Sequence, residues 1–588
     1  MNRRYYLVYL PTRAEILITS RPEAVAALRE DEPPRQILVG DRSFPHWLAA
    51  ALARRARTVL AERRNEKDLR RVIVRAVRER LRWWGRPATF TWETWPPTPF
   101  FPFPSDLAAA VLAGLEGKIL SSGEIHYLFR GGLPGAEGED LLAELALRGE
   151  IEVMPAVEAL QLDRAVCRRC GQIVLQREDC WFCGEPDCWI CPACHNLGPA
   201  TGCGTLYARA RPAKSGRAVA LFPPSFGFTL TPAQQRAAAA LADFLRSGAE
   251  EFLLWAVCGA GKTEVVFSAL TVALAQGDRV LLSTPRRDVA ADLAARARTA
   301  FPSIGLAVHH GGHHEEENPD PLLTVATTHQ CLRFYRAFDL VILDEVDAFP
   351  YHGNRMLYHA VARARGPGGR LVYVTATPPD ELTGRLRDGR LPYVRLPVRP
   401  HGHPLPVPQF IRLSLRPGDI DREVPSALAE IIAATIAKGR RLLLFVPTVR
   451  AAEEAGRTLA KWGADRGLRI AWLHAADPER EAKRTLFAQG RLAVLVTTTV
   501  LERGLTLGPI DVGVLWADHE AVFDAATLIQ MAGRAGRLAA APEGTVYFLA
   551  ARISPAMKAA RAAILAANEE AAREGFLTTL ATQGATPS

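Results

Sequence analysis

The sequence predicts an α/β protein whose second half forms two tandem lobes, each built on a parallel sheet. A cysteine module and an α+β N-terminal region precede them. Apolar segments of strand length alternate with helical patterns from about residue 225 to residue 550, which is the rhythm of parallel sheets. A glycine-rich GAGKT turn follows the first of these strands. Eight of the ten cysteines fall between Cys167 and Cys203, which indicates a small unit stabilised by metal.

The overall composition is that of a globular protein. The 588 residues suffice for three or four domains, since a compact domain holds roughly 100 to 200 residues. Hydrophobic residues make up 48% of the chain and charged residues 23%. No apolar run in the sequence approaches the roughly 20 residues of a membrane helix. The formal charge of +9 favours a polyanionic partner. Clustered cysteines without a signal peptide indicate a reducing cytoplasm.

The N-terminal region is arginine-rich and is predicted to begin with a strand, followed by two basic helices at 48–64 and 68–84. The aromatic and proline-rich stretch after them predicts an extended linker, with base stacking by Trp92 or Trp95 as the alternative. An amphipathic helix and a short β-rich segment then fit a winged-helix-like unit. The predicted domains are 1–104 (basic region and linker), 105–165 (small helical region), 166–210 (cysteine module), 221–397 (first lobe), 398–550 (second lobe) and 551–588 (helical C-terminal tail).

A phosphate-binding loop is predicted in FLLWAVCGAGKTEVV, which joins an apolar strand, a glycine-rich turn and a helix. Gly259 and Gly261, on either side of Ala260, would let backbone amides approach the phosphate oxygens of ATP. Lys262 is predicted to hold the β and γ phosphates, and Thr263 to ligate Mg²⁺. Only the first glycine of the usual pattern is missing.

An acidic motif follows a later apolar strand that ends in DEVD. This strand would deliver Asp344 and Glu345 to the edge of the sheet beside the phosphate loop. We predict that Asp344 holds Mg²⁺ and that Glu345 orients and polarises the attacking water. Asp347 is predicted to couple the lobes or to serve the structure. Thr375 and Thr377, at the end of another strand, could donate hydrogen bonds to the acidic motif.

Other polar residues of the first lobe lie near strand ends. The segment LTPAQQ resembles an adenine-side glutamine motif, with Gln234 as its candidate. The hydroxyls of Thr284, Thr327 and Thr328 are suited to gripping a phosphate backbone. The histidine-rich string at 309–314 is predicted to be a solvated loop, with metal binding as the alternative.

The second lobe lacks a phosphate loop of its own but contains TTTVLERG and QMAGRAGR. Glu502 and Arg503 could couple the binding of nucleic acid to the state of the nucleotide at the ATP site. Arg534 and Arg537 are predicted to lie on one side of a helix and to reach across the cleft toward the γ phosphate. Gln530 lies one turn earlier and is assigned to the nucleotide site. Hydrolysis would then require the lobes to close.

The clustered cysteines come mostly in pairs with two-residue gaps, the spacing at which one turn presents two thiolates to tetrahedral Zn²⁺. Eight ligands suffice for two zinc sites with no open position for catalysis. The sequence leaves the pairing open. One nested arrangement places Cys167, Cys170, Cys191 and Cys194 on one zinc, and Cys180, Cys183, Cys188 and Cys203 on the other. An iron-sulfur cluster is the alternative.

The order of these motifs resembles that of helicases and translocases with two RecA-like P-loop lobes. The cysteines ahead of the motor, with WAVCGAGKTE, DEVDAFP, HGHPLP, TTTVLERG and QMAGRAGR, resemble the bacterial late competence family ComFA. The resemblance implies an ATP-dependent translocase of single-stranded DNA that drives DNA uptake in natural transformation. It implies a membrane DNA channel and cytoplasmic competence proteins as partners, and a cytoplasmic location at the inner face of the membrane.

Two alternatives stay open. The primosomal helicase PriA is similar in GKTE and QMAGRAGR, but its cysteines interrupt the second lobe, whereas here they precede the first. A duplex-unwinding helicase of replication restart would separate forked DNA. The alternative of another class is a nucleic-acid-binding scaffold without ATPase activity, against which Lys262, Asp344, Glu345 and Arg537 argue. Polarity of movement, oligomeric state and zinc count are left open by the motifs.

Overall fold

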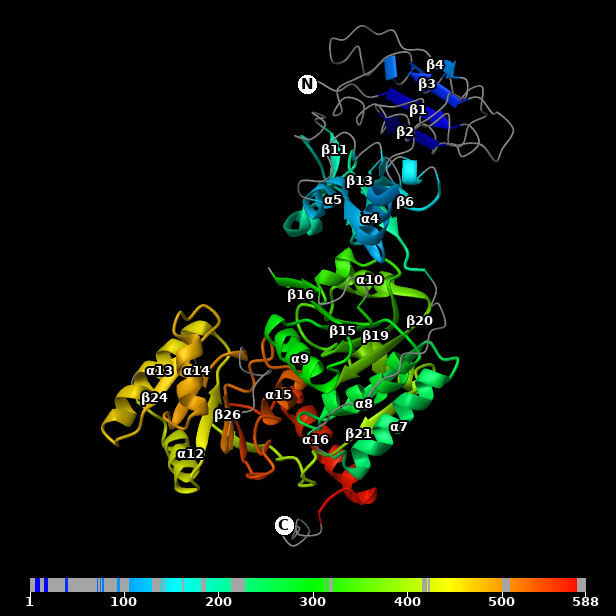
Figure 1. The fold of residues 1–588 in the computed structure, drawn as a ribbon. Helices are drawn as coiled ribbons and strands as arrows, with labels where there is room; N and C mark the ends of the chain where they lie inside the picture. The colour runs from blue at the N-terminus through cyan, green and yellow to red at the C-terminus, as the bar shows by residue number, and fades with distance from the viewer. Residues whose placement is uncertain are drawn as a thin grey trace. The chain divides into compact units, whose positions relative to one another are not determined.

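A computed structural model gives the fold of the chain (Figure 1). One compact unit comprises Met1–Ser215 with Thr327–Val341 and Gly353–Gly369, and the other comprises Gly216–Ala326, Ile342–His352 and Arg370–Ser588. Among the helices of the described residues, none combines the length and apolar character needed to cross a bilayer. The structure describes residues 6–10, 15–19, 37–40, 71, 74–75, 77–78, 92–95, 105–129, 138, 141–142, 144–146, 148–160, 163–180, 187–212, 227, 229–311, 313–316, 321–414, 420, 423–499 and 508–578.

The N-terminal region contains an antiparallel sheet with the strand order β2-β1-β3-β4. The predicted first strand is confirmed as β1, and the described residues between 71 and 78 are helical, as predicted. The prediction of an extended linker is wrong for Trp92–Trp95, because these β-favouring residues pair with β3. The strands are β1 (Tyr6–Leu10), β2 (Glu15–Thr19), β3 (Ile37–Gly40) and β4 (Trp92–Trp95).

A small α+β module follows. Its antiparallel sheet has the order β5-β13-β6, and described residues between 138 and 146 form a further helix. Ser121 and Glu124 form a capping box at the start of α5, which satisfies backbone N–H groups at that end. The elements are α4 (Ser105–Leu115), β5 (Lys118–Ser121), α5 (Ser122–Leu128), β6 (Glu152–Pro155) and β13 (Thr205–Arg209). Its core contains Val111, Leu115, Leu120, Ile125, Leu141, Leu142, Leu145, Ile151 and Tyr207.

The cysteine-rich segment lies between β6 and β13, so it is inserted between two strands of the module's own sheet. It forms two three-stranded sheets, with the orders β7-β8-β9 and β10-β11-β12. The winged-helix-like description of residues 105–165 remains a prediction. The elements are β7 (Val157–Ala159), β8 (Ala165–Cys167), β9 (Ile173–Val174), β10 (Arg177–Glu178), β11 (Cys188–Cys191), η1 (Pro192–Leu197) and β12 (Ala200–Thr201).

The first lobe is built on an eight-stranded sheet with the order β17-β16-β18-β15-β19-β20-β14-β21. The pairs β14–β20, β14–β21 and β16–β18 are parallel. The strands are β14 (Glu251–Ala256), β15 (Val280–Thr284), β16 (Leu306–His310), β17 (His313–Glu316), β18 (Leu323–Thr327), β19 (Phe338–Asp344), β20 (Arg365–Thr375) and β21 (Tyr393–Leu396). The helices are α7 (Pro232–Arg246), α8 (Lys262–Ala275), α9 (Arg287–Ala300), η2 (Gln330–Arg333), α10 (Arg355–Ala364) and α11 (Asp380–Arg387).

The histidine-rich string is a β-hairpin at the edge of this sheet, so the prediction of a solvated loop is wrong. His309 pairs with His314 and His310 with His313 across the antiparallel β16–β17 pair. His310 is only 8% exposed. The string extends the sheet because β16 already pairs with β18 on its other side.

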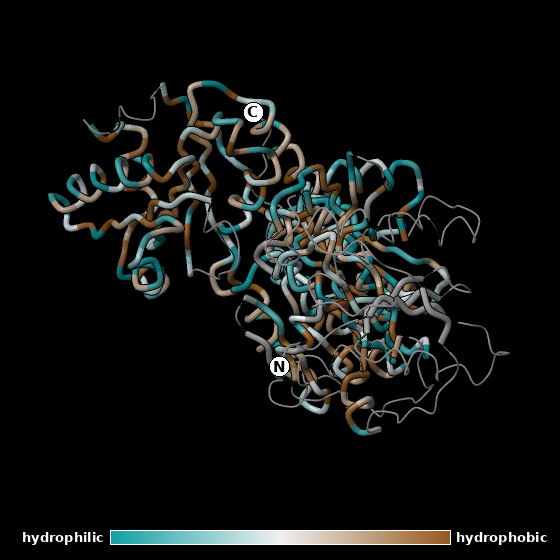
Figure 2. The backbone as a smooth tube through the Cα atoms, turned by 90° about the horizontal axis from the view of Figure 1, so that it is seen from above, coloured by the Kyte–Doolittle hydropathy of each residue, from teal (hydrophilic) through white to brown (hydrophobic). Residues whose placement is uncertain are grey.

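The second lobe has a six-stranded parallel sheet with the order β22-β27-β26-β23-β25-β24. Leu443 and Phe445 pack into one core, and Leu442 and Leu444 into another, as expected for a sheet covered on both faces. Figure 2 colours the backbone by hydropathy, and short hydrophobic and hydrophilic stretches alternate along the chain. The elements are β22 (Gln409–Arg412), α12 (Ser426–Ala437), β23 (Arg441–Phe445), α13 (Val449–Ala464), β24 (Ile470–Leu473), α14 (Arg480–Ala488), β25 (Val494–Thr497), β26 (Ile510–Leu515), α15 (Ala525–Ala532), β27 (Val546–Ala550) and α16 (Pro555–Arg573).

Candidate nucleotide site and metal centres

The predicted phosphate-binding loop lies between β14 and α8. Gly259 and Gly261 have φ angles of 79° and 80°, a conformation that suits glycine. A Cβ at Gly261 would lie 2.3 Å from Nε2 of Gln234, so any other residue here would displace that side chain. Gln234 donates from Nε2 to the Ala260 carbonyl at 3.0 Å, and its Oε1 accepts from the Thr231 amide at 3.0 Å. The glutamine therefore braces the loop, and its contact with adenine stays a prediction.

Lys262, Thr263 and Asp344 meet around one small pocket beside this loop. The Lys262 Nζ lies 3.9 Å from Oδ1 of Asp344. Burial alone would lower the pKa of Lys262, but the neighbouring Asp344 carboxylate raises it above its usual value. Burial raises the pKa of Asp344, a penalty that a bound cation would offset. The hydroxyl of Thr263 and the carboxylate of Asp344 are oxygen ligands of the kind Mg²⁺ takes.

Glu345 lies directly after β19 in a left-handed backbone conformation, with φ of 55°. This conformation is uncommon for residues other than glycine. Its amide donates to Oδ1 of Asp344 at 2.9 Å, so the turn fixes both acids together. Backbone conformations of this kind are concentrated at functional sites.

Asp347 is the residue of the acidic motif that accepts the predicted hydroxyl hydrogen bonds. Thr375 donates to its Oδ1 at 2.5 Å, and Thr377 donates to its Oδ2 at 2.7 Å. Thr375 is the buried last residue of β20, and Thr377 lies two positions after it. The prediction that these hydroxyls contact the acidic motif is confirmed.

Gln530, on α15 of the second lobe, contacts two motifs of the first. Its Nε2 donates to Oδ2 of Asp347 at 3.4 Å, and its Oε1 accepts from Sγ of Cys258 at 3.0 Å. Cys258 belongs to the phosphate-binding loop. The side chain thus joins the loop and the acidic motif of one lobe to the arginine motif of the other.

The two predicted arginine fingers do not lie on one side of a helix, so that part of the prediction is wrong. The helix α15 ends before them, with Gly533 at its C-cap, and Gly536 has φ of 60°. Arg534 and Arg537 therefore lie on the turn after the helix. Burial and the nearby Arg537 lower the pKa of Arg534 to about 9. The side chain of Arg537 lies beside Gly259 of the phosphate-binding loop.

Arg399 is a site residue that the sequence reasoning missed. It is only 1% exposed, and its guanidinium group donates to four backbone carbonyls. Nε donates to Cys258 at 3.0 Å, and Nη2 donates to Gly533 at 2.8 Å. Nη1 donates to Ala535 and Gly536, both at 2.6 Å. The neighbouring HGHPLP string pointed to this segment, but nothing in its residue pattern pointed to the arginine.

Three threonines that were predicted to contact nucleic acid are buried in this structure. Thr284, Thr327 and Thr328 are buried, with at most 7% of their surface exposed. Glu502 and Arg503 lie outside the described residues.

The first cysteine centre, formed by Cys167, Cys170, Cys191 and Cys194, has the geometry of a one-ion site. All four sulfurs are buried and lie within 4.8 Å of one another. The Cys167–Cys194 and Cys170–Cys191 sulfurs are 3.7 Å and 3.5 Å apart. Four sulfurs around a tetrahedral Zn²⁺ lie about 3.8 Å from one another. A cluster of several irons binds its cysteines through different metal atoms and would separate the sulfurs further.

The second cysteine centre contains Cys180, Cys188 and Cys203, whose sulfurs also lie within 4.8 Å of one another. The sulfurs of Cys180 and Cys203 are 3.7 Å apart. Cys183, the predicted fourth ligand, lies outside the described residues. Each centre groups the cysteines as in the nested arrangement, as far as the structure describes them, and both could bind metal ions.

The comparisons with known proteins agree with this geometry. Residues 231–384 match the DEAD/DEAH box helicase family, and residues 423–539 match the helicase conserved C-terminal domain. The competence protein ComFA of Bacillus subtilis (strain 168) is 37% identical over 411 residues, which cover 69% of this chain and 86% of that protein. The chain belongs to the ComFA family. It carries the ATPase domains of a DEAD/DEAH helicase, as the motifs predicted.

Two further likenesses involve one relative and one solved structure. ComFA of Streptococcus pneumoniae (strain ATCC BAA-255 / R6) is 37% identical to this ComFA-family chain over 350 residues, which cover 58% of the chain and 78% of the relative. The structure of S. cerevisiae Dbp5 bound to RNA and ADP BeF3 aligns with a TM-score of 0.42 and 20% identity, covering 58% of this chain and 88% of that one.

Elemental analysis of the purified protein should find about two zinc atoms per chain if each cysteine centre holds one tetrahedral ion. Cys191→Ser should reduce the content to about one, because it removes a thiolate from the first centre only. Ser283→Ala provides a control with unchanged zinc. Iron together with visible absorbance would contradict this expectation.

Arg399→Ala should lower kcat for ATP hydrolysis by roughly tenfold or more, since it leaves four backbone carbonyls without their donor. Nucleotide affinity should change less, because Lys262 and Thr263 are untouched. Steady-state hydrolysis and binding of a fluorescent ATP analogue measure the two quantities. Arg466→Ala is the matched control, since Arg466 donates to Trp462 on an exposed part of α13. Equal kcat in Arg399→Ala and the wild type would show that this contact does not position the site.

Proposed function

We propose that this chain is an ATP-dependent translocase of single-stranded DNA, with DNA-stimulated ATPase activity, that drives DNA uptake in natural transformation. Its membership of the ComFA family carries the proposal. The contacts of Gln530 with Cys258 and Asp347 support it, because a motor must link its nucleotide motifs to movement of its second lobe.

In this proposal the first lobe binds the nucleotide and supplies the hydrolytic groups. Lys262 holds the β and γ phosphates, while backbone amides from Gly259 to Gly261 cradle them. Mg²⁺, held by Thr263 and Asp344, would neutralise negative charge on the phosphates. Glu345 orients the attacking water and accepts its proton.

The second lobe supplies positive charge to the same reaction. Arg534 and Arg537 follow α15 on a turn, and Arg537 lies beside Gly259. Two cations brought to the γ phosphate stabilise the charge that develops during phosphoryl transfer. Gln530 links the second lobe to the acidic motif of the first through its hydrogen bond to Asp347. Hydrolysis and lobe position are coupled because neither lobe holds all the required groups.

The proposed track is a single strand gripped through its phosphates, with little dependence on base sequence. A membrane DNA channel and cytoplasmic competence proteins are the proposed partners, at the inner face of the membrane. Two zinc ions in the cysteine centres would have a structural role, since four thiolates leave no open coordination position.

Lys262→Ala should abolish DNA-stimulated ATP hydrolysis, because it removes the ammonium group that holds the phosphates. Arg537→Ala should lower kcat by about 10³-fold or more, as expected for an arginine finger, and should leave binding of a fluorescent ATP analogue intact. Hydrolysis retained in Lys262→Ala would contradict the assignment of this loop. Lys438→Ala, at the C-cap of α12, is the control variant.

ATPase measured side by side with single-stranded DNA, duplex DNA and RNA should be highest with single-stranded DNA. Affinity for the strand should fall steeply between roughly 50 and 200 mM salt, as phosphate contacts release counterions. Strand separation on forked DNA would favour the PriA-like unwinding alternative. Absence of turnover with every substrate would favour the scaffold alternative instead.

A further inference from the structure

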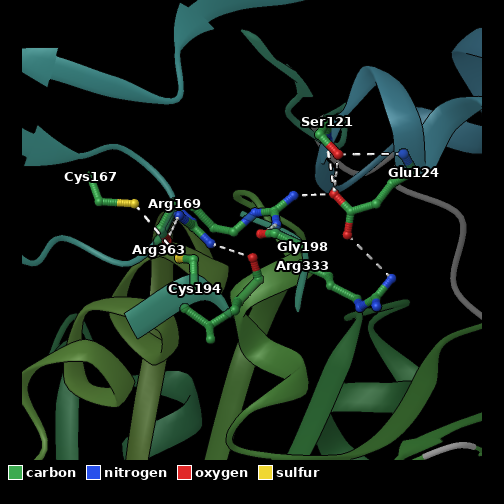
Figure 3. A network of polar contacts seen from close by, with 9 residues as sticks. Ser121, Glu124, Cys167, Arg169, Cys194, Gly198, Arg333 and Arg363 are labelled. Atoms are coloured by element: carbon green, nitrogen blue, oxygen red, sulfur yellow. Dashed lines mark hydrogen bonds and ion pairs between the residues drawn. The ribbon is translucent and has the colours of Figure 1, made fainter. Parts of the chain in front are cut away.

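Arg363, near the C-terminal end of α10, contacts the first cysteine centre through backbone carbonyls (Figure 3). Its Nη1 donates to the carbonyls of Arg168, at 3.1 Å, and of Arg169. Its Nε donates to the Phe334 carbonyl at 3.2 Å, and its Nη2 donates to the Leu332 carbonyl at 2.8 Å. The first two carbonyls lie in the turn between the ligands Cys167 and Cys170. One guanidinium group therefore joins that turn, η2 and α10.

A second polar contact lies beside the first and involves Glu124. This carboxylate is paired with Arg169, which is 2% exposed, and its Oε1 lies 3.6 Å from Nη1 of Arg333. Ser121 also donates to Glu124, at 2.9 Å, and Arg169 donates to the Gly198 carbonyl at 3.5 Å. Figure 3 shows these side chains converging from α5, the cysteine turn and η2.

The charges of this network are unequal. Glu124 supplies one negative charge, while Arg169, Arg333 and Arg363 supply three positive charges. Burial and the neighbouring Arg169 lower the pKa of Arg363 only to about 10, so Arg363 remains charged at neutral pH. A buried positive charge is stabilised by negative charge nearby. The network therefore favours a neighbour that carries negative charge.

A zinc ion with four thiolates is such a neighbour, since it carries a net charge of about −2. The first cysteine centre fits this ion, because its sulfurs have the spacing of a tetrahedral site. Loading of the centre would then fix the shape of the turn whose carbonyls Arg363 reaches and also compensate the charge of Arg363.

We propose that Arg363 is the positioning residue that holds the first cysteine centre against Thr327–Val341 and Gly353–Gly369, and that zinc in this centre maintains the contact. The cysteine module would thus act as a metal-dependent brace on η2 and α10. This inference does not rest on the translocase proposal, and it concerns packing that can be measured without any turnover.

The test compares amide hydrogen exchange, followed by mass spectrometry, in the full-length zinc-loaded protein and in Arg363→Met. We expect Arg363→Met to keep its zinc, measured by elemental analysis, while peptides covering 330–336 and 166–171 exchange at least tenfold faster. Wild-type protein treated with a chelator should show the same acceleration at 330–336. Arg363→Lys keeps the charge but has fewer donors, so its acceleration should be smaller.

Arg385→Met is the matched control. Arg385 pairs with Glu251 at 2.6 Å on the same lobe but takes no part in the network, so 330–336 should exchange as in the wild type. Unchanged exchange at 330–336 in Arg363→Met would overturn the role of the arginine. Unchanged exchange in the chelated wild type would overturn the role of the metal. Loss of zinc from Arg363→Met would also overturn the proposal, since the arginine would then belong to the metal site itself.

Discussion

The guanidinium group of Arg399 donates hydrogen bonds to backbone carbonyls both in the phosphate-binding loop and in the turn that carries Arg534 and Arg537. The helix α15 ends with Gly533 at its C-cap, and Gly536 in the turn that follows has φ of 60°. Backbone carbonyls in such a turn need donors from outside the helix when they are buried. Arg399 donates to carbonyls of this turn and to the carbonyl of Cys258. The charge also complements the negative end of the helix dipole. The turn that carries Arg534 and Arg537 is therefore held to the loop that is proposed to bind the nucleotide.

Arg363 solves the same physical problem in the other compact unit. It too donates to carbonyls from two segments that are far apart in the sequence, one at the end of η2 and one in the cysteine turn. Arginine suits both positions because its planar group presents five donors in a fixed arrangement, whereas lysine presents three from one point. Its charge persists despite burial, so each contact also needs compensation nearby. At Arg399 the helix end contributes, and at Arg363 the metal-loaded cysteine centre is proposed to do so.

Residues whose role depends on their immediate neighbours could be predicted from the sequence. The loop around Gly259 and Gly261 lies between a strand and a helix as its pattern required, and the cysteine pairs group as their spacing suggested. Predictions failed where tertiary packing decides. The histidine string pairs with a strand edge that the sequence does not show, and the turn at Gly536 ends a helix that periodicity would extend. Arg399 and Arg363 looked like ordinary arginines, because their acceptors are backbone carbonyls, which any residue could supply.

The position of the cysteine module explains why side chains must fix its packing. It connects β6 to β13, which are neighbours in one antiparallel sheet, so its two ends lie about one strand spacing, roughly 4.8 Å, apart. Such an insertion can fold on closely spaced ends and imposes little on the rest of the chain. Its own sheets have only two to four residues per strand, too few to bury much apolar surface. Metal ions can supply the missing folding free energy. Polar contacts must then fix the orientation of the module within its unit. The arginines that contact Glu124 are well placed to do so.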